Sequence, residues 1–468
     1  MSNKVTLLAV LVFVCRMHGA GATAPPLLAP DERYKADLLL IVAHPDDDVV
    51  IGGYLARASL DQHKRIAVIY CTPGDGGGNA VGNEAGAALG QMRIIEARRA
   101  LASLGIENVW FLGGHDTPGQ DPLRSLDRWG HGHMLEEMVR LVRLTRPEVI
   151  LTWLPDYVVG ENHGDHQAAG VLATEAFDLA GDRTQFAEQV WPARNRTGMS
   201  NLTEGLLPWQ CKKLYFATDA FEDFGPYWHD SRDLSPFRKN FLDGHGPTYS
   251  NTDVSASRHK SYARLNAEQQ LFYLTQEGYL ATQAFAANDL RAFEYPMRLI
   301  FGKSLVGGAV TGDVFEGVSQ KPAYSPPRTL PGGGRPAVEF EIGGPWAFYS
   351  GFWKVHGLDN LAGLIPVPEA SVGFGHMLSA PLFIWNNTGA EITVKLRSRL
   401  PAEWIDKTAY DSYPVRPGEA YPLRVEVMAP AGGQDQWQEL VWSADAGGQP
   451  VGVVRMRVLV KKSGGMTE

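Results

Sequence analysis

Between about residues 36 and 175, short apolar runs rich in β-branched residues alternate with segments whose apolar positions recur at helical spacing. The runs predict strands at residues 38–42, 66–71, 108–112 and 148–153. The other segments predict helices near residues 49–60, 89–101 and 134–144. Because this alternation is typical of βαβ units, we expect an α/β fold with a Rossmann-like, largely parallel sheet flanked by helices.

The pattern changes twice further along the chain. It weakens from residue 176 to residue 310, where one helix is expected near 262–279, and we interpret residues 36–315 as a single domain. A stretch rich in proline and glycine then predicts a linker at 316–336. Short alternating runs separated by turn residues follow, with little helical periodicity. They predict a C-terminal all-β sandwich domain over residues 337–462.

The first 22 residues have the pattern of a secretory signal. Lys4 precedes an apolar stretch at residues 5–15, and Ala20-Gly21-Ala22 matches the small-residue pattern of a cleavage site. The apolar stretch is too short to span a bilayer. We therefore expect residues 1–22 to be a cleaved signal peptide, the mature protein to be secreted or periplasmic, and no integral membrane span.

Composition and charge exclude several classes of partner. The chain is 44% hydrophobic and 20% charged, as in globular proteins, and its net charge of −9 becomes −11 once Lys4 and Arg16 leave with the signal peptide. Such an acidic chain repels nucleic acid and anionic lipid, so we expect neither as a partner. Cys71 and Cys211 are able to pair in an oxidising compartment or to serve as small core residues, and the sequence leaves both readings open.

Two polar clusters follow strands that lie far apart in the sequence. The segment A-H-P-D-D-D at residues 43–48 follows the first strand, and H-G-D-H at residues 163–166 comes after the fourth. The carboxyl ends of parallel strands share one sheet edge, so the clusters can meet there. Catalytic zinc takes about three such ligands and keeps a position open for water, and His44, Asp47 and His166 supply a suitable trio.

The donor types favour particular metals. Imidazole suits zinc or ferrous iron, whereas a site made of oxygens alone suits magnesium or calcium. We expect Zn²⁺, with Fe²⁺ as the alternative. Taken alone, either cluster is explained as well by a polar turn as by a metal site, because proline and aspartate favour turns. Two clusters after separate strands of one α/β pattern are harder to explain in that way.

Four ordered motifs make the chain resemble the PIG-L/LmbE-like family of metal-dependent de-N-acetylases. The family hallmark A-H-P-D-D-E corresponds to residues 43–48, and its H-x-D-H corresponds to residues 163–166. Between them, residues 72–77 resemble its T-x-G-E-x-G loop and residues 89–97 its L-G-x-x-R-x-x-E-A helix. The resemblance covers about residues 36–310. Aspartate replaces the family's glutamate at Asp48 and Asp75, which puts in doubt any contact that the longer side chain makes around the metal ligands.

The resemblance implies a role for each matching residue. It makes His44, Asp47 and His166 the metal ligands, Asp46 the general base, His163 the acid or oxyanion-stabilising group, Asp165 a residue that orients a histidine, and Arg93 and Asp116 contacts to the sugar. The chemistry has independent support. A divalent metal lowers the pKa of its bound water, a neighbouring carboxylate shuttles the proton, and an imidazolium stabilises the oxyanion.

Some residues near the motifs have a second interpretation. Arg93 is placed to pair with Glu96 at i+3 instead of contacting a sugar. Three further histidines lie in or near a glycine-rich stretch and are more often rim residues than ligands: His115, His131 and His133. Aromatic residues able to form a sugar platform are more often core residues: Trp129, Trp153, Tyr157, Trp385, Trp404 and Trp442.

Together these patterns predict a secreted, zinc-dependent N-deacetylase. We expect it to hydrolyse the amide of an N-acetylated amino sugar or glycoconjugate. One alternative is an amidase that acts on an N-acyl substrate without a sugar, because one fold accepts many substrates through loop variation. The other is a non-catalytic, glycan-binding surface protein in which the metal is only structural.

Overall fold

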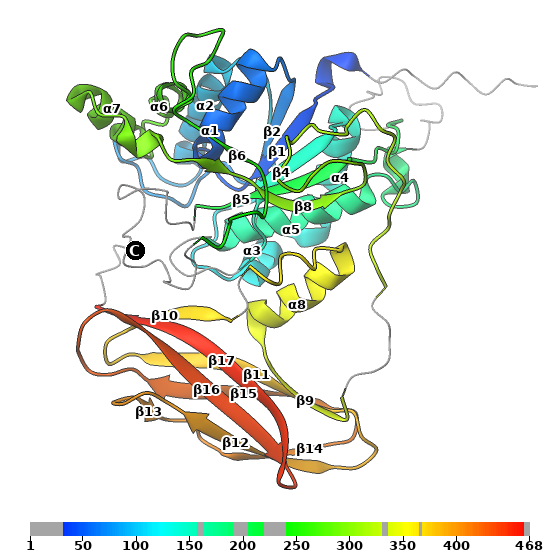
Figure 1. The fold of residues 1–468 in the computed structure, drawn as a ribbon, viewed down its shortest axis with the longest axis vertical. Coiled ribbons are helices and arrows are strands. Elements are labelled where there is room, and N and C mark those ends of the chain that lie inside the picture. The colour runs from blue at the N-terminus through cyan, green and yellow to red at the C-terminus, as the bar shows by residue number, and fades with distance from the viewer. Residues whose placement is uncertain are drawn as a thin grey trace, which may run out of the picture.

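The computed structural model describes residues 31–156, 163–190, 205–219, 240–329, 336–364 and 367–462. The expected signal peptide, Tyr157 and part of the expected linker lie outside these ranges. Figure 1 shows an α/β part, which holds the N-terminal two thirds of the chain, and an all-β part below it. Within the described ranges, no helix has the length and hydropathy that crossing a bilayer requires.

A six-stranded sheet with the order β3-β2-β1-β4-β5-β8 forms the centre of the α/β part. All neighbouring strands are parallel except the edge strand β8. Their bounds are β1 Leu38–Val42, β2 Ile66–Tyr70, β3 Asn108–Phe111, β4 Val149–Trp153, β5 Lys213–Ala217 and β8 Ile300–Ser304. The four predicted strands are confirmed to within one residue at each end. The expected largely parallel sheet is confirmed as well.

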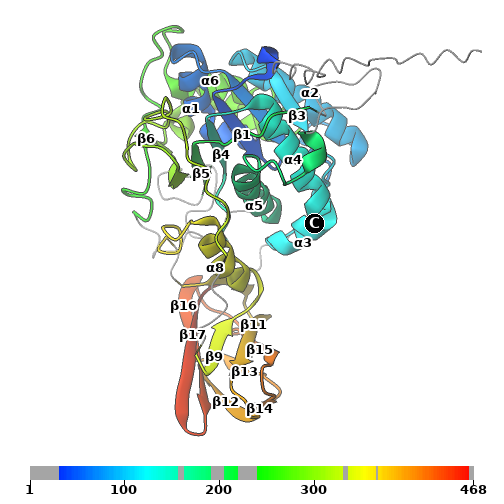
Figure 2. The ribbon, with the colours of Figure 1, turned by 90° about the vertical axis from the view of Figure 1, so that its right-hand side faces the viewer.

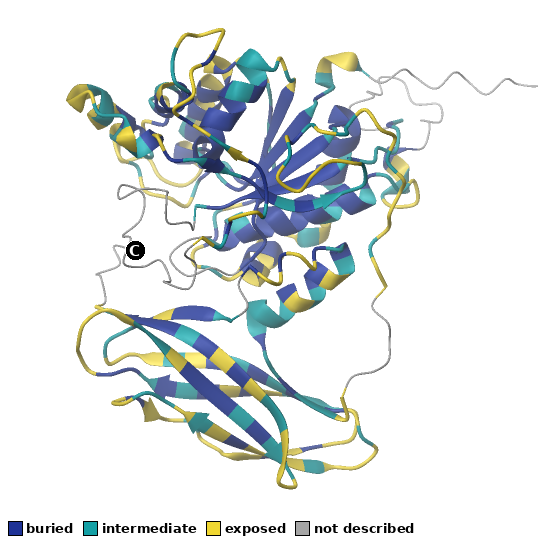
Figure 3. Ribbon diagram, in the orientation of Figure 1, coloured by how far each residue is buried: buried dark blue, intermediate teal, exposed yellow. Residues whose placement is uncertain are grey.

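Every residue of β1, β2, β4 and β5 is buried because helices cover both faces of the sheet, as Figure 3 shows. Cys71 and Cys211 are free, buried thiols, in agreement with their reading as core residues. The strand order reverses direction between β1 and β4, and ligands of open α/β sheets bind at such a point.

The helices of the α/β part are α1 Gly52–Ala56, α2 Ala87–Ser103, α3 Pro122–Trp129, α4 His131–Thr145, α5 Gly164–Leu179, α6 Tyr262–Gln270 and α7 Gly278–Ala287. A 3₁₀ turn, Asp47–Ile51, precedes α1, and a π turn, Arg57–Asp61, follows it. A small antiparallel ribbon consists of β6 Thr248–Tyr249 and β7 Met297–Arg298, and the ring centroid of Tyr249 lies 4.8 Å from that of Tyr54 on α1.

The single helix expected at residues 262–279 is wrong, because a turn at residues 271–277 separates α6 from α7. The backbone N–H and hydroxyl of Thr275 donate to the buried carboxylate of Glu96, at 3.0 Å and 2.7 Å. A continuous helix would need that N–H for its own ladder. A tertiary contact has therefore overridden the local helical pattern.

The all-β part consists of two facing sheets with the orders β10-β17-β16-β12-β14 and β13-β15-β11-β9. Its strands are β9 Val338–Ile342, β10 Glu369–Gly373, β11 Met377–Asn386, β12 Ile392–Arg399, β13 Ile405–Asp406, β14 Ser412–Val415, β15 Ala420–Met428, β16 Gln436–Ala446 and β17 Gln449–Lys461. The predicted β-sandwich is confirmed. It has a separate core, in which Trp442 is fully buried.

The helix α8, Gly344–His356, was not expected within the range predicted to be all β. Figure 2 shows it between α5 and the sandwich, and Tyr349, Phe352 and Trp353 pack into the core of the α/β part. The hydroxyl of Tyr349 donates to Gln167 on α5 at 2.9 Å. Apolar side chains between residues 348 and 364 thus pack with the core of the α/β part, although they lie within the range predicted for the sandwich domain, and Trp346 packs against the core of the sandwich.

Candidate metal centre

The loop after β1 separates the side chains of two consecutive aspartates. Asp46 adopts a left-handed conformation with φ of +106°, which is rare for a residue other than glycine, and the 3₁₀ turn begins at Asp47. Oδ2 of Asp47 accepts the backbone N–H of Ala43 at 2.9 Å and of His44 at 3.0 Å, and the indole N–H of Trp153 at 2.7 Å. Three donors thus hold one oxygen and direct the other, Oδ1, toward the cavity side of the loop.

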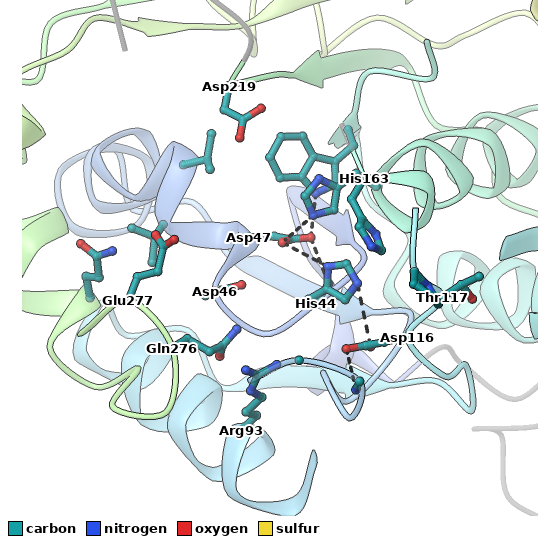
Figure 4. Close-up of a pocket in the computed structure, with 18 of the residues that line it drawn as sticks. His44, Asp46, Asp47, Arg93, Asp116, Thr117, His163, Asp219, Gln276 and Glu277 are labelled. Atoms are coloured by element: carbon teal, nitrogen blue, oxygen red, sulfur yellow. Dashed lines mark hydrogen bonds and ion pairs between the residues drawn. The ribbon is translucent and has the colours of Figure 1, made fainter. Parts of the chain in front are cut away.

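The two motifs meet at this second oxygen. Oδ1 of Asp47 lies 3.2 Å from Nε2 of His166 and 3.6 Å from Nδ1 of His44. These three ligand atoms all lie within 4.8 Å of one another, as Figure 4 illustrates for His44 and Asp47. Zinc binds nitrogen and oxygen at about 2.1 Å, so ligand atoms of one tetrahedral ion lie roughly 3.4 Å apart. The donor set therefore fits a single divalent ion, and the predicted meeting of the motifs is confirmed.

A second group of potential ligands, His44, His163 and Asp165, overlaps the first. Asp165 is buried, and its Oδ2 accepts the backbone N–H of Thr117 at 2.7 Å and lies 3.2 Å from Nε2 of His44. A carboxylate on one ring nitrogen commonly orients a histidine that binds metal through the other. This contact is the one that the predicted orienting role of Asp165 requires, and it leaves Nδ1 of His44 to face Asp47 in the group with His166.

His163 caps the N-terminus of α5 and lines the cavity. Its Nδ1 accepts the backbone N–H of Asp165 at 3.3 Å, which leaves the proton of a neutral ring on Nε2. Burial, and next the neighbouring His44 and His166, lower the pKa of His163 to about 4. With this pKa the ring is a neutral imidazole that donates an N–H at neutral pH, and the role of His163 in catalysis stays a prediction.

Asp46 lines the same cavity. Burial, followed by the charges of Asp47 and Glu277, raises the pKa of its carboxyl group well above the ordinary range. A cation held by Asp47 and the two histidines would oppose this shift by favouring the carboxylate. Burial and the neighbouring negative charges thus raise the pKa of Asp46, and a bound cation would lower it. A carboxyl group between these two influences is suited to accept and return a proton near neutral pH.

The cavity around these residues has a volume of about 640 Å³. One side comes from the motif loops and the helices that follow them: Gly76, Gly77, Arg93, Asp116, Thr117, Pro118 and Arg128. The other side includes residues from the region where the sequence pattern was weak: Asp219, Gln270, Gln276 and Glu277. No motif had indicated these four residues.

Arg93 and Asp116 both line the cavity, and both are tied to the loop at residues 72–78. Arg93 donates to the carbonyls of Gly74 and Gly78, each at 2.7 Å. The carboxylate of Asp116 accepts the N–H of Gly76 at 2.9 Å. The alternative pairing of Arg93 with Glu96 is wrong, since Glu96 accepts from Thr275 instead. Contact with a sugar stays a prediction for both residues.

The surplus histidines lie outside both candidate ligand groups. Nδ1 of His115 is 2.6 Å from Asp75, and the side chain is 65% exposed. His131 pairs with Glu175 at 2.6 Å. Trp153, in contrast, was read as a core residue or a sugar platform, yet it stacks on His166 at 4.3 Å between ring centroids. Its position at the end of β4 was the one signal that could have indicated this.

Asp48 points away from the candidate ligands. Its Oδ1 accepts the hydroxyls of Tyr70 at 2.6 Å and Tyr273 at 2.5 Å, and Gln269 donates to Oδ2. Burial raises the pKa of Asp48 to about 6. The shorter side chain at this position therefore contacts the region of α6, and the metal ligands do not depend on it directly.

Comparison with known proteins agrees with this geometry. Residues 39–177 match the family described as PIG-L: GlcNAc-PI de-N-acetylase. A 1D-myo-inositol 2-acetamido-2-deoxy-alpha-D-glucopyranoside deacetylase of Tsukamurella paurometabola is 32% identical over 206 residues, which cover 36% of this chain and 68% of that protein. The chain therefore belongs to the PIG-L family.

Two further relatives are also 1D-myo-inositol 2-acetamido-2-deoxy-alpha-D-glucopyranoside deacetylases, and that of Frankia alni is numbered 1. That of Frankia alni is 32% identical over 37% of this chain and 59% of its own length. That of Streptomyces scabiei is 28% identical over 62% of this chain and 92% of its own length. The chain thus spans little more than half of the Frankia alni protein, and nearly all of the Streptomyces scabiei protein at lower identity.

Proposed function

We propose that this protein is a metal-dependent N-deacetylase that hydrolyses the acetamido group of an amino sugar or glycoconjugate. The observation that carries the proposal is the carboxylate of Asp47, which has one oxygen held by three N–H donors and the other directed at two imidazoles. Membership of the PIG-L family and the names of the relatives support the reaction and the class of substrate.

Zinc is the metal that we propose, with ferrous iron as the alternative. Two imidazoles and one carboxylate suit either ion better than they suit magnesium or calcium. When bound, such an ion lowers the pKa of water and polarises the amide carbonyl. His44, Asp47 and His166 would hold it, with Asp165 and Trp153 fixing the orientation of the ligands.

The remaining residues would move the protons. Asp46 takes a proton from the water whose oxygen forms a bond to the acetyl carbon. The N–H of His163 donates to the carbonyl oxygen as negative charge develops there. The bond between carbon and nitrogen then breaks, the proton passes to the leaving amine, and acetate and the free amino sugar are the products.

Metal analysis and acetate release test the proposal together. We expect about one zinc or iron per chain and acetate release from N-acetylglucosaminides, but little from N-acyl amines without a sugar. Asp46→Asn should lower kcat at least about a hundredfold with the metal retained. Asp253→Asn, at a carboxylate that pairs with Arg57 on the surface, is the matched control and should change neither. Turnover that survives Asp46→Asn would show that another group is the base.

We also propose that the protein is exported, as secreted or periplasmic protein. The basis is the sequence pattern of residues 1–22, with cleavage before Thr23. N-terminal sequencing of the protein recovered outside the cytoplasm should begin at Thr23. Recovery only inside the cytoplasm, with Met1 or Ser2 as the first residue, would overturn this part of the proposal.

A further inference from the structure

The turn between α6 and α7, residues 271–277, is anchored to two of the motif elements. The hydroxyl of Tyr273 donates to Asp48, which follows the candidate ligand Asp47 in the chain, at 2.5 Å. The N–H and hydroxyl of Thr275 both donate to Glu96 on α2. Tyr273, Thr275, Asp48 and Glu96 are all buried, so water competes little for these hydrogen bonds.

A third anchor lies next to the cavity. The side-chain amide of Gln276 donates to the carbonyl of Pro45, at 2.5 Å, in the same loop as Asp46. Gln276 and the next residue, Glu277, both line the cavity. Figure 4 shows both of them on the side of Asp46 that is away from Thr117. The turn thus holds the carboxylate of Glu277 at one wall of the site.

Asp219, which follows β5, also lines the cavity, and Figure 4 shows it with Glu277 among the residues around the site. With Gln270, Gln276 and Glu277 it forms what we call the acidic wall: two carboxylates and two amides. Among the described residues that line the cavity, the basic ones are Arg93 on α2 and Arg128 on α3, which belong to the motif side. The described carboxylates of the acidic wall thus come from the segment after β5 and from the turn before α7, whereas the described arginines come from α2 and α3.

The cavity has room for more than the reacting group. Its volume of about 640 Å³ is within the range of sites that enclose drug-sized ligands. A substrate with its acetamido group at the candidate metal ligands would extend beyond them, and the acidic wall is one of the surfaces that it would meet. Carboxylates there attract a cation and repel an anion, the more strongly because the cavity is partly shielded from water.

We infer that the acidic wall selects substrates by the charge of the group attached to the acetamido sugar. It accepts neutral, hydroxyl-rich groups, favours groups that carry an amine, and disfavours phosphorylated groups. Asp219 and Glu277 are the specificity-determining residues, and the amides of Gln270 and Gln276 are placed to bind hydroxyls. This inference rests on the proposed function, since it names the substrate class of the same site.

Three matched glycosides test it: ethyl, 2-aminoethyl and 2-phosphoethyl N-acetylglucosaminide. With the metal-loaded protein at low salt, kcat/KM should be highest for the aminoethyl glycoside and about tenfold lower for the phosphoethyl than for the ethyl glycoside. In the double variant Asp219→Asn with Glu277→Gln, the three values should agree within about threefold. The ratio of kcat/KM between two glycosides is taken within one variant, so a change that lowers turnover of all three glycosides alike does not alter it.

Glu268→Gln is the control, because this α6 carboxylate pairs with Lys260 and Arg264 away from the cavity, and its ratios should equal those of the wild type. Unchanged ratios in the double variant would overturn the inference while hydrolysis of the ethyl glycoside still supports the proposed function. If the wild type hydrolyses none of the three, the proposed function fails. Dissociation constants of the same glycosides, measured by calorimetry, then test the wall alone, and equal constants would overturn it.

Discussion

The two sides of the cavity arise in different ways. The motif side is built by the loop after β1 and by the start of α5, which follows β4 in the chain. The neighbouring parallel strands β1 and β4 bring His44 and His166 together. The acidic wall is built by the end of α6, by the turn that follows it and by Asp219 after β5. Hydrogen bonds of Tyr273, Thr275 and Gln276 hold the turn to the motif elements. On this account the motif side determines the reaction and the acidic wall determines the choice of substrate. Variants of the motif side should therefore lose metal or turnover, whereas variants of the acidic wall should change kcat/KM between substrates.

The largest expected effect is on the motif side. His166→Ala removes a candidate ligand at 3.2 Å from Asp47, so we expect loss of the metal and a fall in turnover of at least about a thousandfold. His163→Ala should lower the rate with the metal still bound. Metal content and kcat, measured on the same samples, check both variants. Loss of the metal in His163→Ala alone would mean that the two histidines have exchanged roles.

Trp153→Phe should have the next largest effect. Phenylalanine keeps an aromatic ring against His166 but removes the N–H that donates to Asp47 at 2.7 Å. We expect metal affinity to fall roughly ten- to a hundredfold, as is usual when a partner of a ligand is lost. Competition with a chromophoric chelator measures the affinity. An unchanged affinity would show that the two backbone donors suffice to fix Asp47.

The sequence predicted the motif side far better than the acidic wall, and the reason is physical. His44 and His166 follow strands whose buried runs are evident, and parallel strands end at one edge. Glu277 lies at the end of a turn whose Thr275 bonds to Glu96, 179 residues away in the chain, whereas the local pattern at 262–279 favours an uninterrupted helix. The aromatic residues of α8 likewise gave no sign of which core they would join.

Thr275→Val should act on the acidic wall with a smaller effect. The change removes the hydroxyl that donates to Glu96 at 2.7 Å, in a buried setting. We expect the free energy of unfolding to fall by about 1–2 kcal/mol and kcat/KM to fall several-fold, with metal affinity unchanged. Urea unfolding and the chelator assay check this. Weaker metal binding would show that the two sides of the cavity are not independent.

The smallest expected effect is the pH dependence of stability that comes from Asp48. This residue follows the candidate ligand Asp47 and accepts a hydrogen bond from Tyr273 in the turn before α7. Burial raises the pKa of Asp48 to about 6, above the value in the unfolded chain, so the folded state binds this proton more tightly. The contribution of this group to stability therefore increases as the pH falls through 6 toward 4. Relative to Asp48→Asn, the wild type should gain about 1 kcal/mol in unfolding free energy between pH 7 and pH 5. A difference that does not change with pH would contradict the shift.

The central claim is that His44, Asp47 and His166 bind one transition-metal ion. Anomalous diffraction at the zinc and iron absorption edges, from crystals of the protein as purified, tests it directly. We predict a single peak within bonding distance of Nδ1 of His44, Oδ1 of Asp47 and Nε2 of His166. A peak among His44, His163 and Asp165, or none at any of these residues, would contradict the account.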